Sequence, residues 1–139
     1  NAAVVPRRDV GLGDLGGLGG LGALPLATLG LHVHLAEAQR LGAGEILLNS
    51  IDEDGRMEGY DIPLIRSVSD AVDLPVVAVG GAGTTAHFAP VVLKGGAAAV
   101  AAGSIFHYTK ITPNMVKKAM ADCQIPVRLA DSNVEYIIE

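Results

Sequence analysis

The stretch EILLNSIDEDGRMEGYDIPLIRSVSDAVDLPVVAVGGAG, residues 45–83, decides the fold of this chain. It begins with a short apolar run at 45–50, which is followed by a polar loop. After Asp61, an N-cap residue type, apolar residues recur at helical spacing. A second apolar run at 76–79 ends in the glycine-rich turn 80–83. Strand, helix and strand in this order predict a βαβ unit with a parallel sheet.

The alternation of predicted strands and helices continues on both sides of this unit. A helix is predicted at 32–41, where apolar residues are mixed with charged ones at helical spacing. After the glycine turn, the sequence predicts a helix at 84–94, a third apolar strand at 97–102, and a helix that Thr112 and Pro113 open. The strands are apolar without alternation, which is typical of a parallel sheet covered by helices on both faces. The predicted fold class is therefore α/β.

Composition limits the function classes that fit the chain. It has 139 residues, 50% of them hydrophobic, and a formal net charge of −5 with only 10 lysines and arginines. Nucleic-acid binding requires clustered positive charge, so we expect no nucleic-acid partner. The single cysteine, Cys123, cannot form a disulfide within the chain, so we predict a cytoplasmic protein.

The beginning of the chain differs from the rest. Seven of the 18 glycines lie between Gly11 and Gly22, in GLGDLGGLGGLG. The uncharged run is long enough for a membrane span, but its glycines and Pro25 weaken any helix and interrupt a secretory signal. We therefore expect residues 1–30 to form a flexible, low-complexity segment, and we expect no membrane partner.

Glycines and a serine follow the second and third predicted strands. Gly80, Gly81 and Gly83 come between a strand and a helix, and Gly103 and Ser104 come after the third strand. In a parallel sheet of this kind the site lies at the carboxyl ends of the strands. Glycine amides there can approach an anion closely. The sequence favours a phosphate site at this edge, with tight turns as the alternative explanation of the glycines.

Other motifs near these strand ends are less informative. Residues 81–86 fit the dinucleotide fingerprint G-x-G-x-x-A, but the acidic residue required about 20 positions on is lacking at 101–105. The carboxylates 52–54 have no histidine placed to complete a metal site, so a solvated turn is favoured. His87 and His107 are each isolated, and surface or packing roles are expected. We predict no metal and no cofactor.

Three blocks of the sequence resemble a known family. They are GAGEILLNSIDEDGRMEGYDIPLIRSVSDAV at 42–72, LPVVAVGGAG at 74–83 and GGAAAVAAGSIFHYT at 95–109. Over about residues 31–129 the chain is similar to the cyclase subunit of imidazole glycerol phosphate synthase, of histidine biosynthesis. The resemblance implies part of a (βα)8 TIM barrel, namely strands six to eight with their helices. The sequence itself predicts a tail at 130–139.

The resemblance also implies an activity and partners. Members of this family are lyases that take ammonia from a glutaminase subunit, with which they form a heterodimer. They use the ammonia on a ribulosyl phosphate substrate and yield imidazole glycerol phosphate and an aminoimidazole carboxamide ribonucleotide. Such a substrate carries a phosphate at each end. The resemblance therefore agrees with the phosphate site that the glycines at the strand ends favour.

Matched positions imply roles for particular residues. The residues that match family positions holding one substrate phosphate are Asp54, Gly55, Gly81, Gly103 and Ser104. Asn49 and Asp52 match the substrate pocket. Glu45, at the start of its strand, matches a charged gate at the opposite end of the barrel, where ammonia enters.

Some family positions have no counterpart in the sequence. The two catalytic aspartates of the family lie on the first and fifth strands, so no catalytic residue is assigned here and we expect the chain alone to be inactive. Val79 and Gly103 differ from the residues common at their positions. They fit a paralogous subunit thought to amidate surface sugars, which is the second interpretation. A non-catalytic, phosphate-binding half-barrel is the third.

Overall fold

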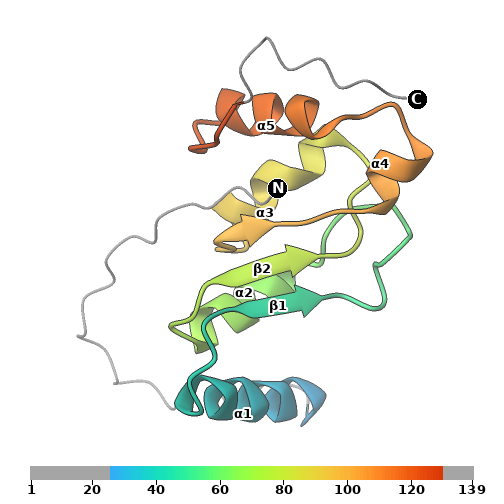
Figure 1. Cartoon of the computed structure of the whole chain (residues 1–139). Coiled ribbons are helices and arrows are strands. Elements are labelled where there is room, and N and C mark those ends of the chain that lie inside the picture. The colour runs from blue at the N-terminus through green and yellow to red at the C-terminus, as the bar shows by residue number, and fades with distance from the viewer. Residues whose placement is uncertain (1–25, 130–139) are drawn as a thin grey trace.

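The structure, a computed structural model, describes residues 26–129 (Figure 1). Its elements in chain order are α1 (Leu26–Arg40), β1 (Ile46–Asn49), α2 (Ile62–Ala71), β2 (Val76–Val79), η2 (Thr85–His87), α3 (Phe88–Leu93), β3 (Ala99–Val100), α4 (Ser104–Tyr108) and α5 (Pro113–Asp122). The predicted segment 1–30 lies outside the described residues except for its last five, which belong to α1, and the predicted tail 130–139 lies outside them entirely.

The three strands form one parallel sheet in the order β1-β2-β3. Ile46 pairs with Val76, and Val77 pairs with Ala99. The predicted α/β class with a parallel sheet is therefore confirmed. β3 has only two residues, whereas the sequence predicted a strand at 97–102. Alanine, which supplies most of that run, is a poor strand former, so pairing is limited to its centre.

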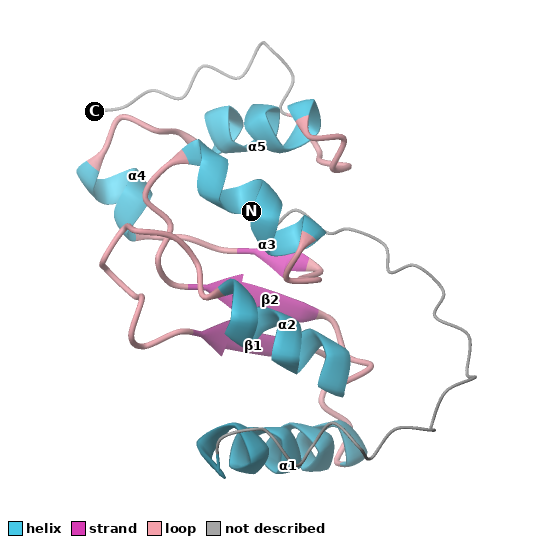
Figure 2. Cartoon of the chain, turned by 180° about the vertical axis from the view of Figure 1, so that it is seen from behind, coloured by secondary structure: helices cyan, strands magenta, loops and turns pink. Residues whose placement is uncertain are grey.

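The sheet is covered by helices on one face within residues 26–129. In Figure 2, which views the chain from behind, α2 lies in front of β1 and β2, whereas no helix lies in front of these strands in Figure 1. Ile46, Leu48, Val76 and Ala78 are buried on the covered face. Leu47, which points the other way, is 68% exposed. The prediction of cover on both faces therefore differs from the described structure, in which an apolar face stays open.

Helix α2 starts where the sequence predicts it. The Asp61 side chain accepts a hydrogen bond from the backbone amide of Leu64 at 2.9 Å, and Pro63 stands in the first turn. An N-cap carboxylate satisfies an amide that has no partner within the helix. Ile65 and Val68 are buried beneath the helix, so one face of α2 contributes to the core.

Three other helices differ from the sequence prediction. α1 begins at Leu26, six residues before the predicted start. The predicted helix 84–94 begins as the 3-10 turn η2 and continues as α3, so that Pro90 falls in the first turn of α3. Proline is tolerated there because that amide has no acceptor within the helix. The five-residue helix α4 was not predicted, since one turn shows no measurable periodicity.

The core lies between the covered face of the sheet and α2, α3 and α5. Its largest fully buried side chains are Phe88, Ile105, Met120, Val68, Val76 and Val91. Tyr60, at the end of the loop after β1, reaches this core and meets Phe88 edge to face, with ring centroids 5.7 Å apart. Among residues 26–129, no helix has the length and apolar character that crossing a membrane requires.

Candidate functional site

The carboxyl ends of all three strands lie at one edge of the sheet, where the loop after β1 crosses to the turn after β2 (Figure 1). The amide of Gly59 donates to the carbonyl oxygen of Gly81 at 2.7 Å. The amide of Ser50 donates to the carbonyl oxygen of Val79 at 3.2 Å. The loop 51–60 is thus joined to the second strand end at both of its ends. Sequence reasoning placed these segments at one edge, and the structure brings them into contact.

Glycine is required sterically at two positions of the turn after β2. A Cβ atom on Gly81 would lie 1.9 Å from the carbonyl oxygen of Gly59, and one on Gly83 would lie 1.8 Å from that of Met57. Both distances are far shorter than any real carbon–oxygen contact. Gly81 also has a φ of +98°, a conformation that other residues rarely adopt. These glycines therefore let two backbone segments pack directly against each other.

Two predicted pocket residues lie beside the same turn. A Cβ atom on Gly80 would meet the side-chain oxygen of Asn49 at 2.7 Å and the Cβ of Asp54 at 3.5 Å. Asn49 is the last residue of β1, and it is exposed. Asp52 and Gly55 belong to the same loop and are also exposed. Asn49 and Asp54 thus lie beside the glycine turn, and Asn49, Asp52, Asp54 and Gly55 are all exposed.

The third strand end is joined to the others through Tyr60. Its hydroxyl donates to the carbonyl oxygen of Ala101 at 2.8 Å, and burial raises the pKa of this phenol above its ordinary value. Gly103 is exposed, with no heavy atom within 4 Å of a Cβ placed on it. Ser104, half-buried, begins α4. Gly103 therefore borders open space on the same edge as Gly81, and Ser104 follows it.

Glu45 lies at the other end of the sheet. It directly precedes β1 and is exposed, while Asn49 ends the same strand. A strand rises about 3.3 Å per residue, so the four steps from Glu45 to Asn49 span about 13 Å. Glu45 is thus separated from the strand-end residues by the length of the strand.

The loop after β1 is acidic and contains one cation. Arg56 pairs with Glu58 at 2.5 Å and with Glu53 at 3.7 Å. The hydrogen bond with Glu58, and then the charge of Glu53, raise the pKa of Arg56 above its ordinary value. All three side chains reach solvent, where such pairs contribute little to stability. Since Arg56 is engaged by carboxylates, an anion at this edge would have to be bound mainly by backbone amides.

Two residues at this edge were not identified as site residues from the sequence. His87, for which a surface or packing role was expected, is half-buried, and its Nδ1 accepts a hydrogen bond from the amide of Gly83 at 3.1 Å. Tyr60 joins the loop to the third strand end. The only sequence signals were a histidine four residues after the glycine turn and an aromatic residue closing a polar loop. Neither signal indicates the residue to which the side chain hydrogen-bonds, because both contacts depend on the tertiary fold.

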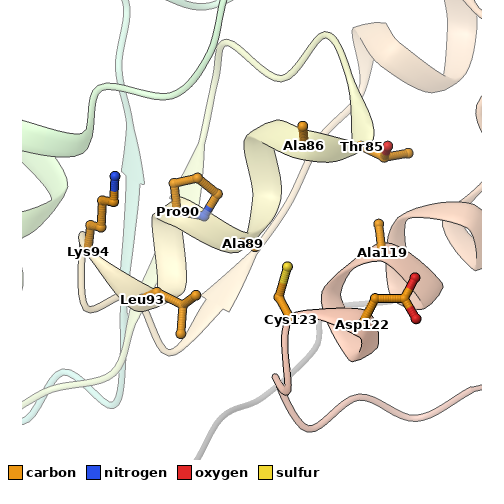
Figure 3. Close-up of a pocket in the computed structure, with 9 residues that line it drawn as sticks. All are labelled: Thr85, Ala86, Ala89, Pro90, Leu93, Lys94, Ala119, Asp122 and Cys123. Carbon is orange, nitrogen blue, oxygen red and sulfur yellow. The ribbon is translucent and has the colours of Figure 1, made fainter.

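A pocket of about 450 Å³ lies away from the sheet, between α3 and α5 (Figure 3). Its lining is mostly apolar and consists of Thr85, Ala86, Ala89, Pro90, Leu93, Lys94, Ala119, Asp122 and Cys123. None of the predicted site residues lines it. In the described part of the chain, no group of three or more histidines, cysteines and carboxylates is arranged to hold a metal ion.

Comparisons with known proteins agree on one family. The model for the histidine biosynthesis protein family matches residues 27–112. Imidazole glycerol phosphate synthase subunit HisF of Hyphomonas neptunium is 54% identical over 92 residues, which make up 66% of this chain and 36% of that protein. HisF of Thermococcus onnurineus is 55% identical over 93 residues, 67% of this chain and 36% of that protein. HisF of Caulobacter vibrioides is 54% identical over 94 residues, which make up 68% of this chain and 36% of that protein. The chain spans about a third of the length of these relatives.

Proposed function

This chain belongs to the histidine biosynthesis protein family, and on that premise we propose that it is part of the cyclase subunit of imidazole glycerol phosphate synthase. The complete subunit would be a lyase that uses ammonia to convert a ribulosyl phosphate to imidazole glycerol phosphate and an aminoimidazole carboxamide ribonucleotide. The observation that carries this proposal is the identity of 54–55% to three HisF proteins over 92–94 residues.

We propose that β1, β2 and β3 are the sixth, seventh and eighth strands of a (βα)8 barrel within residues 31–129. Their parallel order supports this assignment, as do the helices α2 and α3 in the connections between them. The open face, with Leu47 68% exposed, also supports it. In a closed barrel that face would point to the interior, where apolar side chains fill the space.

A substrate phosphate would lie between the strand ends. We propose that the amides of Gly55, Gly81, Gly103 and Ser104 bind it, together with the Ser104 hydroxyl. Carboxylates cannot bind an anion, and they are the main charged groups of this loop. Backbone amides would therefore supply the hydrogen bonds to the phosphate. The amide of Asp54 already donates to the carbonyl oxygen of Ser50 at 2.9 Å. Asp54 would therefore order the loop, while Gly55 presents its amide.

The other residues that match family positions have proposed roles as well. Asn49 and Asp52 would face the substrate from the end of β1 and from the loop that follows. Glu45, at the opposite end of the strand, would belong to the gate for ammonia, which a glutaminase partner would deliver there. The cytoplasmic location is part of the same proposal, since the chain has one cysteine and no second thiol for a disulfide.

The chain by itself would not catalyse the reaction. The predicted catalytic aspartates belong to strands one and five, which the proposed strands six to eight do not include. Binding of phosphate and turnover are therefore separate expectations: the first applies to this chain, and the second applies only when the rest of a barrel is supplied.

The direct test is a hybrid enzyme. The matching part of this chain would replace the 94 aligned residues of Caulobacter vibrioides HisF, and ammonia-dependent turnover of the ribulosyl phosphate would be measured. We expect turnover, and we expect Ser104→Ala in the hybrid to raise KM for the substrate. Ser67→Ala, on α2, is the matched control and should leave KM unchanged.

Two outcomes would contradict the proposal. A hybrid that folds, as judged by its melting transition, but does not turn over the ribulosyl phosphate would exclude the histidine-pathway function. Ammonia-dependent amidation of a sugar instead would favour the sugar-amidating paralogue. An unchanged KM for Ser104→Ala would remove that residue from the phosphate site.

A further inference from the structure

His87 lies where the loop after β1 meets the turn after β2. Its Nδ1 accepts a hydrogen bond from the amide of Gly83 at 3.1 Å. The nearest heavy atoms to a Cβ placed on Gly59 belong to the His87 ring, at 3.9 and 4.0 Å. Gly59 in turn donates to the carbonyl oxygen of Gly81 at 2.7 Å. One imidazole thus bonds to the turn after β2 and lies beside the loop after β1, which are two of the three segments of the proposed phosphate site.

Phe88, the residue after His87, also packs against the end of the loop after β1. Phe88 follows His87, and Tyr60 follows Gly59. The Tyr60 and Phe88 rings pack edge to face, with an interplanar angle of 73°, and Phe88 is fully buried. The backbone at His87 is therefore anchored by the core residue directly beside it, and the hydrogen bond from Gly83 orients the ring.

We propose that His87 is a positioning residue that fixes the glycine turn 80–83 for phosphate binding. The inference rests on the proposed function, since it concerns the same site. To accept from Gly83, Nδ1 must lack a proton, so the neutral ring carries its proton on Nε2. The amide of Gly83 is then engaged and is not available to a ligand. The turn is held in the conformation in which Gly81 packs against Gly59.

Two substitutions separate the hydrogen bond from the volume of the ring. In His87→Asn the side-chain oxygen can occupy the position of Nδ1, because both atoms are bonded to Cγ. In His87→Leu the volume remains but the acceptor is lost. The Gly83 amide chemical shift and its hydrogen-exchange rate would be measured by NMR in the full 139-residue chain, together with the affinity for inorganic phosphate and the melting temperature.

We expect His87→Leu to speed exchange at Gly83 and to weaken phosphate binding about fivefold, as loss of one ordering hydrogen bond would do. His87→Asn should restore both properties toward those of the natural chain. A purely structural role for the ring would change the melting temperature without this pattern of rescue.

The exchange measurement decides the inference independently of the proposed function. Unchanged exchange at Gly83 in His87→Leu would overturn the inference, and so would failure of His87→Asn to restore it. If the natural chain does not bind phosphate, the proposed phosphate site is wrong. The exchange data would then still show whether His87 fixes the turn.

Discussion

The turn after β2 has three glycines and the segment after β3 has one, and the glycines of the two regions have different surroundings. A Cβ on Gly81 or Gly83 would collide with the backbone of the loop after β1. A Cβ on Gly103 would meet no heavy atom within 4 Å. Gly81 is buried, and Gly103 is exposed. Two glycine-containing strand ends at one edge of a sheet thus have opposite packing.

The difference separates the scaffold of the candidate site from its open side. The turn after β2 is fixed by contacts within the protein, through Gly59, Met57 and His87. The segment after β3 leaves space beside Gly103, which a ligand could occupy. A site that combines a fixed backbone with adjacent free space is suited to binding a small anion without reorganisation.

The largest effect is expected from Gly81→Ala. The new methyl group would overlap the carbonyl oxygen of Gly59 and would impose a positive φ on alanine. Together these should lower the free energy of unfolding by about 3 kcal/mol. Gly103→Ala is the matched control and should change it by less than about 1 kcal/mol. Urea denaturation measures both values, and similar values for the two variants would contradict the comparison.

Tyr60→Phe tests the link between the loop and the third strand end. It leaves the carbonyl oxygen of Ala101 without its donor, which should cost about 1.5 kcal/mol in unfolding free energy. Tyr108→Phe is the control, since Tyr108 is 80% exposed. If both tyrosines proved equally dispensable in urea denaturation, the loop would not be held to β3 through this hydrogen bond.

The same tyrosine predicts a dependence on alkaline pH. Burial raises the pKa of Tyr60, so above the ordinary value of about 10 the unfolded chain releases this proton before the folded chain does. The unfolded state then binds fewer protons, and stability falls as the pH rises. Tyr60→Phe should remove this part of the decline, and Tyr108→Phe should retain it. Thermal melting between pH 9 and pH 11 gives the slopes.

A smaller effect is expected from Asp61→Ala, which removes the cap of α2 directly after the loop. Its carboxylate accepts from Leu64 at 2.9 Å, so the loss should be about 1 kcal/mol. Thr112→Ala, which caps α5 at 3.3 Å on an exposed surface, should cost about 0.5 kcal/mol. A larger loss for Thr112→Ala than for Asp61→Ala would contradict this expectation, because the cap of α5 would then stabilise the fold more than the cap of α2.

The sequence predicted those parts of the fold that depend on local pattern. β2 has its predicted bounds, and α2 begins after its Asp61 cap. The glycines after β2 and β3 were correctly placed at one edge, because parallel strands end together. The contacts of His87 with Gly83 and of Tyr60 with Ala101 were not predicted. The second joins residues 41 positions apart, and no local pattern specifies such a pair.

In the proposed site, the amides at the ends of β2 and β3 bind a phosphate group. The most direct test is a titration of the nitrogen-15-labelled chain with inorganic phosphate, followed at the glycine amides. We expect saturable shifts at Gly81 and Gly103, with none at Gly42 or Gly96, which precede β1 and β3 at the opposite edge. Shifts confined to Gly42 and Gly96, or no saturable shift at any glycine, would contradict it.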